Sequence, residues 1–243
     1  MSTTTLCFDF GNTRKKCAVF HGQELYEAIV LENDDPETGT AILKKYAPQQ
    51  VILSSVIHHN PEFEIAISEG VRYHKLGHTS KLPFTIPVGK PETVGADRLA
   101  LCAAATFFHP DKNNLIVALG SCITYNFINQ QRQFLGGGIS PGLEFRLRSL
   151  QEYTALLPLV KPEPIVPLIG YDTKTNILSG VILGMAAEID GIVNAYAAKF
   201  GNFNAVLTGG DSSYFVPHLK SRIFADANFI YKGLYAICEF NQT

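Results

Sequence analysis

The sequence lacks an excess of charge of either sign. Its 243 residues include 20 lysines and arginines and 22 aspartates and glutamates, which gives a formal net charge of −2. Proteins that hold a nucleic-acid backbone usually carry a basic surplus. We therefore expect no nucleic-acid partner.

The sequence also lacks paired cysteines. The five cysteines are odd in number, scattered, and contain no CxxC pair. Because most of them lie among apolar neighbours, we expect buried free thiols in a reducing compartment.

Long hydrophobic runs are missing as well. No uninterrupted apolar stretch reaches the roughly 18 residues that suggest a membrane span. The longest candidate, residues 177–196, contains Glu188, Asp190 and Asn194. The N-terminus shows no basic region followed by an apolar core, so we expect no signal peptide. These observations predict a cytoplasmic protein without a membrane partner.

The composition that remains is that of a folded protein with a large core. Hydrophobic residues make up 46% of the chain and charged residues 17%. This balance is typical of globular proteins, and the length suits one large domain or two small ones.

An apolar strand, a glycine turn and a second apolar strand occur twice in the chain. Residues 5–10 and 16–20 flank the first turn, at Gly11 and Asn12, and "LIVALGSCITYNFINQ" repeats the arrangement around Gly120. This diverged duplication predicts two similar α/β domains, 1–112 and 113–243, facing each other across a cleft.

Other segments show simpler signals. Residues 96–107 are rich in alanine and leucine and predict a helix with Asp97 in its first turn. The glycine-rich residues 134–143 and the proline-rich residues 83–91 predict loops. We also predict strands at 50–56 and 205–208 and helices at 144–156, 177–200 and 231–240.

The first glycine turn has the groups that a phosphate requires. A glycine permits the backbone to approach an anion closely, and the N–H groups of the turn point at it. A lysine supplies the balancing positive charge. Asp9 ends the strand and could hold Mg²⁺ through water. A plain hairpin with an incidental aspartate remains the alternative. The candidate phosphate groups are those of Gly11, Asn12, Thr13 and Lys16.

Three later features favour the phosphate interpretation. Gly120 and Ser121 offer a second phosphate contact. Gly209 and Gly210 follow a strand and could support a base and ribose on bare backbone. "VGADR" places a carboxylate beside a guanidinium at a helix start, although a first-turn carboxylate or a local ion pair explains that pair equally well.

In this order the motifs resemble those of the actin, sugar-kinase and Hsp70 superfamily. Within it the chain is similar to type III pantothenate kinases over nearly its whole length. The matching stretches are "DFGNTRKK" at 9–16, "GADR" at 95–98, "GSCIT" at 120–124, "GGGISPGL" at 136–143, "SGVILG" at 179–184 and "LTGGD" at 207–211.

The resemblance implies two ribonuclease-H-like domains with the active site in the cleft between them. It implies ATP-dependent phosphorylation of pantothenate, the first step of coenzyme A synthesis, with Mg²⁺ and a monovalent cation, K⁺ or NH₄⁺. Asp97 would accept the proton of the substrate hydroxyl, since positioning matters more than base strength in phosphoryl transfer. The implied substrate-binding positions are Val88, Gly95, Ala96, Asp97, Arg98 and Thr173.

The sequence departs from the family pattern near the second turn. The aspartate that the family ties to the monovalent cation is Ala118 here, Ser121 replaces a threonine, and Asn126 stands where many relatives have an aspartate. Val88 replaces an expected tyrosine. Because a methyl group cannot coordinate a cation, our hypothesis is that the K⁺ site is weakened or lost.

The family forms homodimers in which the partner chain helps to build the pantothenate pocket. Small residues along 177–200 could make that contact, although internal packing explains them equally well. Two alternative functions stay open. One is a kinase for another small alcohol, and the other is a nucleotide-binding accessory protein without catalytic activity.

Overall fold

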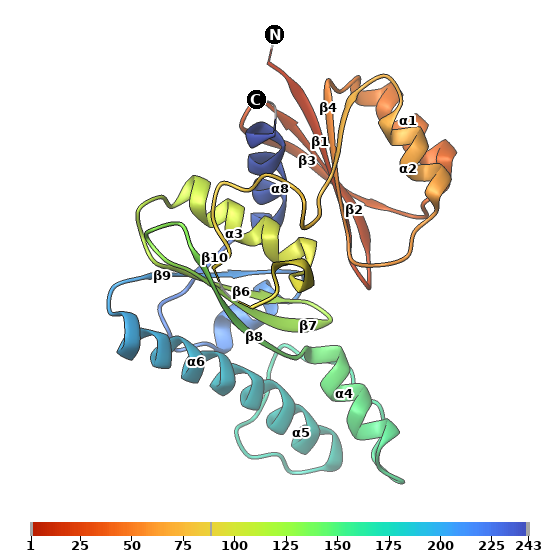
Figure 1. Ribbon diagram of the computed structural model, residues 1–243. Helices are drawn as coiled ribbons and strands as arrows, with labels where there is room; N and C mark the ends of the chain where they lie inside the picture. Colours follow the sequence, from red (N-terminus) through yellow and green to blue (C-terminus); the bar gives the residue numbers. More distant parts are fainter. Residues whose placement is uncertain (1, 88, 242–243) are drawn as a thin grey trace. The chain divides into compact units, whose positions relative to one another are not determined.

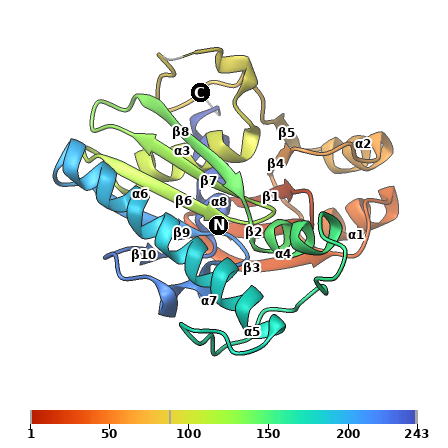
Figure 2. The same cartoon turned by 90° about the horizontal axis from the view of Figure 1, so that it is seen from below.

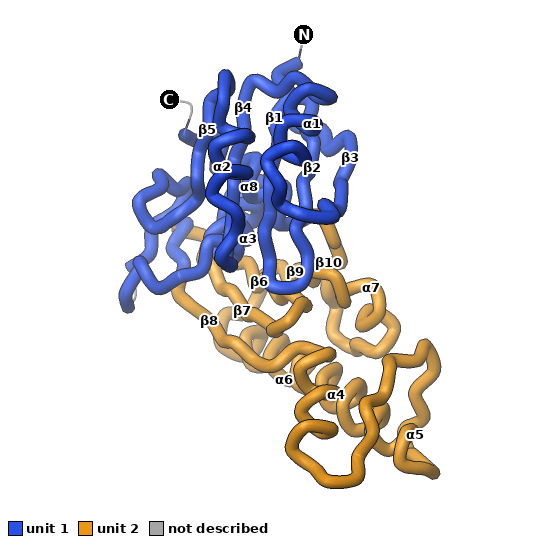
Figure 3. Tube along the Cα trace, turned by 90° about the vertical axis from the view of Figure 1, so that its right-hand side faces the viewer, with its two compact units in different colours: residues 1–110, 132–134, 229–243 blue, residues 111–131, 135–228 orange. Residues whose placement is uncertain are grey.

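The computed structural model describes residues 2–87 and 89–241, so Val88 lies outside the described residues. The described chain forms two compact units, which Figure 3 colours separately. The predicted domain division at residue 112 stays a prediction, and the units differ from it at the C-terminal end. Unit 1 comprises Met1–Pro110, Arg132–Phe134 and Phe229–Thr243, and unit 2 comprises Asp111–Gln131 and Leu135–Asn228.

The sheet of unit 1 has the order β3-β2-β1-β4-β5, and Figure 1 labels its strands β1 to β4. The first three strands run antiparallel, whereas β4 and β5 run parallel to β1. Six of the seven β1 residues are buried, because β1 is the central strand and both of its faces are covered. The strands are β1 (Thr4–Phe10), β2 (Lys15–His21), β3 (Glu24–Leu31), β4 (Gln50–Ser55) and β5 (Arg72–Lys75).

Helices cover both faces of this sheet. Alternate residues of β1, among them Phe8 and Phe10, pack with Phe63 and Ile67 on the side of α1 (Pro36–Tyr46) and α2 (Pro61–Ser68). On the other face, α3 (Ala96–Phe108) and α8 (Phe229–Phe240) pack against each other and against β4. A Cβ on Gly233 of α8 would lie 1.8 Å from the carbonyl oxygen of Ala100, so a glycine is needed there for the two helices to pack this closely.

The sheet of unit 2 repeats the arrangement of unit 1. Its order is β10-β9-β6-β7-β8, with β6 antiparallel to β7 and parallel to β9. The duplication that the two glycine turns indicated therefore extends to the whole sheet order. The strands are β6 (Asn114–Leu119), β7 (Cys122–Ile128), β8 (Phe134–Pro141), β9 (Asn204–Thr208) and β10 (Phe224–Ala225).

The predicted loop at residues 134–143 is wrong, because most of this segment forms strand β8. Gly136 and Gly137 have φ values of +97° and +156°. A Cβ on Gly137 would lie 1.8 Å from the carbonyl oxygen of Tyr125 in β7. The glycines thus permit close approach of the two strands. Glycine content alone does not distinguish such a strand from a loop.

One face of the unit 2 sheet is covered by a long helical segment, Thr173–Phe200, which Figure 2 shows running along the strands. It consists of α5 (Thr173–Leu178), a π-helical turn η2 (Ser179–Leu183) and α6 (Gly184–Phe200). By length and composition alone this helix could cross a membrane. However, several of its apolar residues, including Leu178, Ile182 and Ile189, are buried in the core of unit 2.

The remaining helices of unit 2 are short. The predicted helix at 144–156 begins one residue earlier and ends at Glu152. Most of the predicted elements are present, but the sequence analysis did not predict β3, α1, α2, β5, β10 or the short helix at residues 212–215. The short helical elements not yet described are α4 (Leu143–Glu152), α7 (Ser212–Phe215), η3 (Val216–His218) and, in unit 1, η1 (Pro91–Thr93).

The cysteines agree with the expectation of free thiols. All five are unpaired, four of them are buried, and only Cys122 is exposed.

Candidate active site

Asp9 and Lys16 lie side by side at the end of the first β-hairpin. They are register partners in the antiparallel pair β1–β2, so their side chains lie on the same face of the sheet. That face is opposite to the one that carries Phe8 and Phe10, and it is the face covered by α3 and α8. The structure thereby brings a predicted Mg²⁺ residue and the predicted phosphate lysine together.

Asp97 is held at the N-terminal end of α3, on the same face. A Cβ on Gly95 would lie only 2.5 Å from Asp97 Oδ1, so the carboxylate folds back over the glycine backbone. Gly95 itself has φ −59° and ψ 144°, which any residue can adopt. The glycine is therefore needed for the position of the carboxylate, not for the backbone conformation.

Electrostatics link the two carboxylates. Burial raises the pKa of Asp9 to about 7, the charge of Asp97 adds to this effect, and Lys16 opposes it. Burial also raises the pKa of Asp97, against the backbone N–H and the charge of Arg98. Two interacting carboxyl groups beside one lysine form a site in which added positive charge would be strongly favoured.

Two further residues of this face were missed by the sequence analysis. Ser54 of β4 is the register partner of Asp9 in the parallel pair β1–β4. Its hydroxyl is buried and has no hydrogen-bond partner among the described residues. Tyr231 of α8 is buried, and the charge of Asp9 adds to burial in raising its pKa. No sequence signal separates either residue from core positions.

The first glycine turn is exposed and compact. The Gly11 N–H donates to the carbonyl oxygen of Arg14 at 3.1 Å, which closes the turn. Asn12 and Thr13 are exposed at its tip. The turn therefore begins two residues after Asp9 and presents polar groups at the surface.

In unit 2, the second turn and the later glycine pair lie at the same end of β6. The Gly142 N–H donates to the carbonyl oxygen of Ser121 at 3.1 Å. A Cβ on Gly209, whose φ is +95°, would lie 2.2 Å from the carbonyl oxygen of Leu119, so this turn contacts the β6 end closely. Gly120, Ser121, Gly209 and Gly210 thus form one cluster, although sequence separates the two pairs by almost 90 positions.

Ala118 is the penultimate residue of β6 and lies between two hydroxyl residues of the neighbouring strands. Its register partners are Thr124 of β7 and Thr208 of β9. The Asn126 side-chain amide donates to Thr124 Oγ1 at 3.1 Å, and Thr208 Oγ1 is buried without a partner among the described residues. The register neighbours of Ala118 are therefore hydroxyl side chains and not carboxylates.

The other predicted substrate residues lie in different places. Ala96 and Arg98 belong to the first turn of α3, and the Arg98 guanidinium lies 5.4 Å from the ring centroid of buried Phe134. Thr173 begins α5 in unit 2, where it lines an open, mostly apolar groove of about 550 Å³. The other lining residues are Leu150, Leu157, Asn176, Ile177, Gly180 and Val181.

The described residues contain no cluster of three or more His, Cys, Asp or Glu side chains that could hold a metal ion. Asp9 nevertheless suits Mg²⁺, which keeps several waters and is usually bound through one or two carboxylates together with substrate phosphates.

Solved structures with a similar fold include a Baf-family protein from Campylobacter jejuni and a glucokinase from an Antarctic psychrotroph. The first has a TM-score of 0.61 at 18% identity and covers 97% of this chain and 98% of its own. The second has a TM-score of 0.52 at 9% identity and covers 99% and 100%. At these identities the likeness concerns the fold alone, and it confirms the predicted actin-like two-domain fold.

Sequence relatives are more informative. A type III pantothenate kinase from Christiangramia forsetii is 42% identical over 98% of this chain and 99% of its own length. Another from Flavobacterium johnsoniae is 38% identical over 94% and 95%. The family model described as type III pantothenate kinase matches residues 5–195. With matches that span nearly the full chain, the protein belongs to the type III pantothenate kinase family.

Proposed function

We propose that this protein transfers the γ-phosphoryl group of ATP to the primary hydroxyl of pantothenate, the first step of coenzyme A synthesis. The observation that carries the proposal is the position of Asp97 at the start of α3, on the sheet face that holds Asp9 and Lys16. Family membership supplies the substrate.

Asp97 is the catalytic residue of the proposal. Its carboxylate accepts the proton of the pantothenate hydroxyl as the oxygen attacks the γ-phosphorus, while the bond to the β-phosphate oxygen breaks and ADP leaves. Burial raises the pKa of Asp97 above that of an ordinary aspartate, which makes its carboxylate a better proton acceptor. Arg98, with Gly95 and Ala96, binds the substrate.

Each unit contains groups that suit ATP, and the proposal assigns the phosphates and the nucleoside to these groups. Unit 1 supplies Lys16 and the exposed turn of Gly11, Asn12 and Thr13, whereas unit 2 supplies Gly120 and Ser121, with Gly209 and Gly210 for the nucleoside. In a loose transition state, positioning and charge neutralisation provide most of the rate enhancement.

Mg²⁺ fits beside Asp9, where it would neutralise phosphate charge. Asp9 would hold it through water. A monovalent cation has no such carboxylate at Ala118, and the hydroxyls of Thr124 and Thr208 are weaker substitutes. We therefore propose that K⁺ dependence is weak or absent in this member of the family.

A homodimer is part of the proposal, and exposed apolar side chains of unit 2 support it. Soluble monomers rarely expose such a concentration of large apolar residues. Gly180, Gly184 and Gly191 are also exposed, and no described atom lies within 4 Å of a Cβ built on them, so packing within the chain does not require their small size. The exposed residues are Tyr153 (84%), Leu156 (92%), Ile165 (83%), Leu168 (81%), Ile169 (82%) and Tyr171 (81%).

Light scattering tests the dimer. Leu168→Glu should shift the purified protein from dimer to monomer, because the charge would be buried in the interface. The matched control is Ile65→Glu on α2, a residue that is 66% exposed in unit 1. A wild-type monomer, or equal effects of both substitutions, would remove this part of the proposal.

The central experiment is a product assay. Purified protein is incubated with ATP, Mg²⁺ and pantothenate, and ADP and 4'-phosphopantothenate are measured by mass spectrometry. We expect both products in equal amounts. ADP only with a different alcohol would indicate another kinase, and nucleotide binding without turnover would indicate an accessory protein.

A cytoplasmic location completes the proposal, and cell fractionation tests it.

A further inference from the structure

Asp34 connects the first glycine turn to a neighbouring loop. It follows β3, and its Oδ1 accepts a hydrogen bond from Lys15 Nζ at 2.7 Å. Its Oδ2 accepts a second bond from the backbone N–H of Asn60 at 2.8 Å. The side chains of Lys15 and Asp34 are only 26% and 19% exposed, so solvent screens this pair less than a surface pair.

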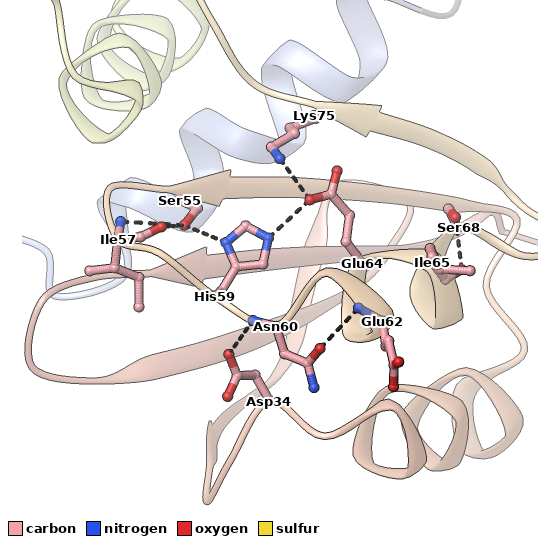
Figure 4. A network of polar contacts seen from close by, with 10 residues as sticks. All are labelled: Asp34, Ser55, Ile57, His59, Asn60, Glu62, Glu64, Ile65, Ser68 and Lys75. Atoms are coloured by element: carbon pink, nitrogen blue, oxygen red, sulfur yellow. Dashed lines mark hydrogen bonds and ion pairs between the residues drawn. The ribbon is translucent and has the colours of Figure 1, made fainter.

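The loop that receives Asp34 is itself held by several polar contacts, shown in Figure 4. His59 is buried between Ser55 and Glu64, with Nδ1 3.0 Å from Ser55 Oγ and Nε2 2.9 Å from Glu64 Oε2. Lys75 Nζ donates to the same Glu64 oxygen at 2.6 Å. The Asn60 side chain caps α2 by accepting from the Glu62 N–H. Asp34 is thus anchored to a fixed loop.

Lys15 and Lys16 are adjacent, but their side chains lie on opposite faces of the sheet, because side chains alternate along a strand. Lys16 lies on the face of Asp9, whereas Lys15 pairs with Asp34. Lys15 is also the first residue of β2, directly after the turn. A contact that fixes Lys15 therefore fixes the stem of the turn at residues 11–14.

We propose that Asp34 is a positioning residue for nucleotide binding: through Lys15 it holds the 11–14 turn in the conformation that receives phosphate, and it keeps the Lys15 ammonium away from the nucleotide. The inference rests on the proposed function. Asp34 acts through another residue and touches neither substrate. Its loss should therefore weaken ATP binding in the ground and transition states alike, which raises KM and leaves kcat almost unchanged.

The test uses full-length protein and steady-state kinetics with ATP varied at saturating pantothenate. Asp34→Asn keeps an oxygen for the Asn60 N–H and removes the charge that pairs with Lys15. We expect the KM for ATP to rise about three- to tenfold with kcat within about twofold of wild type, the range of a partly buried ion pair. Asp34→Glu should recover part of the loss. Asp35→Asn is the matched control, because Asp35 is exposed and its side chain makes no cap hydrogen bond.

A double substitution identifies the route of the effect. If Asp34 acts through Lys15, Lys15→Met alone should raise the KM for ATP similarly, and combining it with Asp34→Asn should add little. Thermal unfolding of each variant shows whether it folds. If Asp34→Asn does not fold, Lys15→Met alone tests the proposal.

The outcomes separate the two proposals. A wild-type protein that does not phosphorylate pantothenate overturns the proposed function. An active wild type whose KM for ATP is unchanged by Asp34→Asn and Lys15→Met overturns the role of Asp34. A fall in kcat alone, or independent and multiplicative effects of the two substitutions, overturns it as well.

Discussion

Asp9 at the end of β1 and Asp97 at the start of α3 interact through their charges. Burial and then the Asp97 carboxylate raise the pKa of Asp9 to about 7. A folded protein that holds two carboxyl groups in this way is less stable than it would be without them. Under the proposed function, this loss of stability accompanies the capacity of the site to bind a polyphosphate with its cation.

The first prediction concerns Asp97 itself. Asp97→Asn keeps the shape of the side chain and removes the proton acceptor, so kcat should fall by about 10²- to 10⁴-fold. The thermal unfolding temperature should not fall, because a buried carboxyl group is replaced by a neutral amide. Isothermal titration with ATP should show binding that is close to wild type. Full activity of the variant would assign the proton to another group.

Gly95 provides the second prediction. An added methyl group in Gly95→Ala would lie 2.5 Å from Asp97 Oδ1, and the carboxylate has to move. Because the Gly95 backbone conformation suits alanine, stability should change little while kcat falls about ten- to hundredfold. The control is Gly77→Ala, where no described atom lies within 4 Å of the new Cβ. Equal kinetics of the two variants would contradict the proposed position of Asp97.

The third prediction is a pH dependence of stability that originates at Asp9. The pKa of Asp9 rises on folding from 3.8 to about 7, so the folded state binds the proton more tightly over this range. The free energy of unfolding should therefore decrease as pH rises from about 4 to about 7. In Asp9→Asn this decrease should become smaller.

Thermal unfolding of the nucleotide-free protein at pH 5 and pH 8 measures the difference. Asp9→Asn should be more stable than wild type at pH 8, with a smaller advantage at pH 5. The same variant should lose Mg²⁺-dependent ATP binding. A variant that is less stable than wild type at pH 8 would show that the Asp9 carboxylate is better solvated than its burial indicates.

Ala118 gives the fourth prediction. In wild type, replacing K⁺ by Na⁺ should change kcat/KM by less than about twofold, because a methyl group offers no ligand. Ala118→Asp would place a carboxylate between the hydroxyl residues Thr124 and Thr208. This variant should gain K⁺ activation of several-fold or more, measured as the ratio of rates in the two salts. Strong K⁺ activation of wild type would contradict the hypothesis that the K⁺ site is weakened or lost.

Local patterns in the sequence were enough to predict much of the fold. An apolar run before a glycine turn predicted β1, a short apolar run predicted β4, and alanine and leucine predicted α3, because those signals report directly on local conformation. The repeated glycine turn also indicated a duplication, which the two equivalent sheet orders confirm. The motif order identified the family, and the relatives confirm that identification.

Other elements were missed because their signals conflict with their structure. Strand β8 is rich in glycine because its backbone approaches Tyr125 closely, and composition alone predicts a loop there. Arg146 of α4 forms a partly buried ion pair with Glu188 of α6, which no local sequence signal indicates. Such a pair depends on a partner more than 40 positions away.

The sequence by itself determined the family and the residues at each glycine turn, because the identity and spacing of motif residues are local properties of the sequence. Only the tertiary structure decided that Asp9, Lys16, Ser54 and Asp97 share one face of the unit 1 sheet, and that Lys15 turns away toward Asp34. Strand register and helix packing bring these residues together across up to 88 positions, and no local preference encodes such a distance.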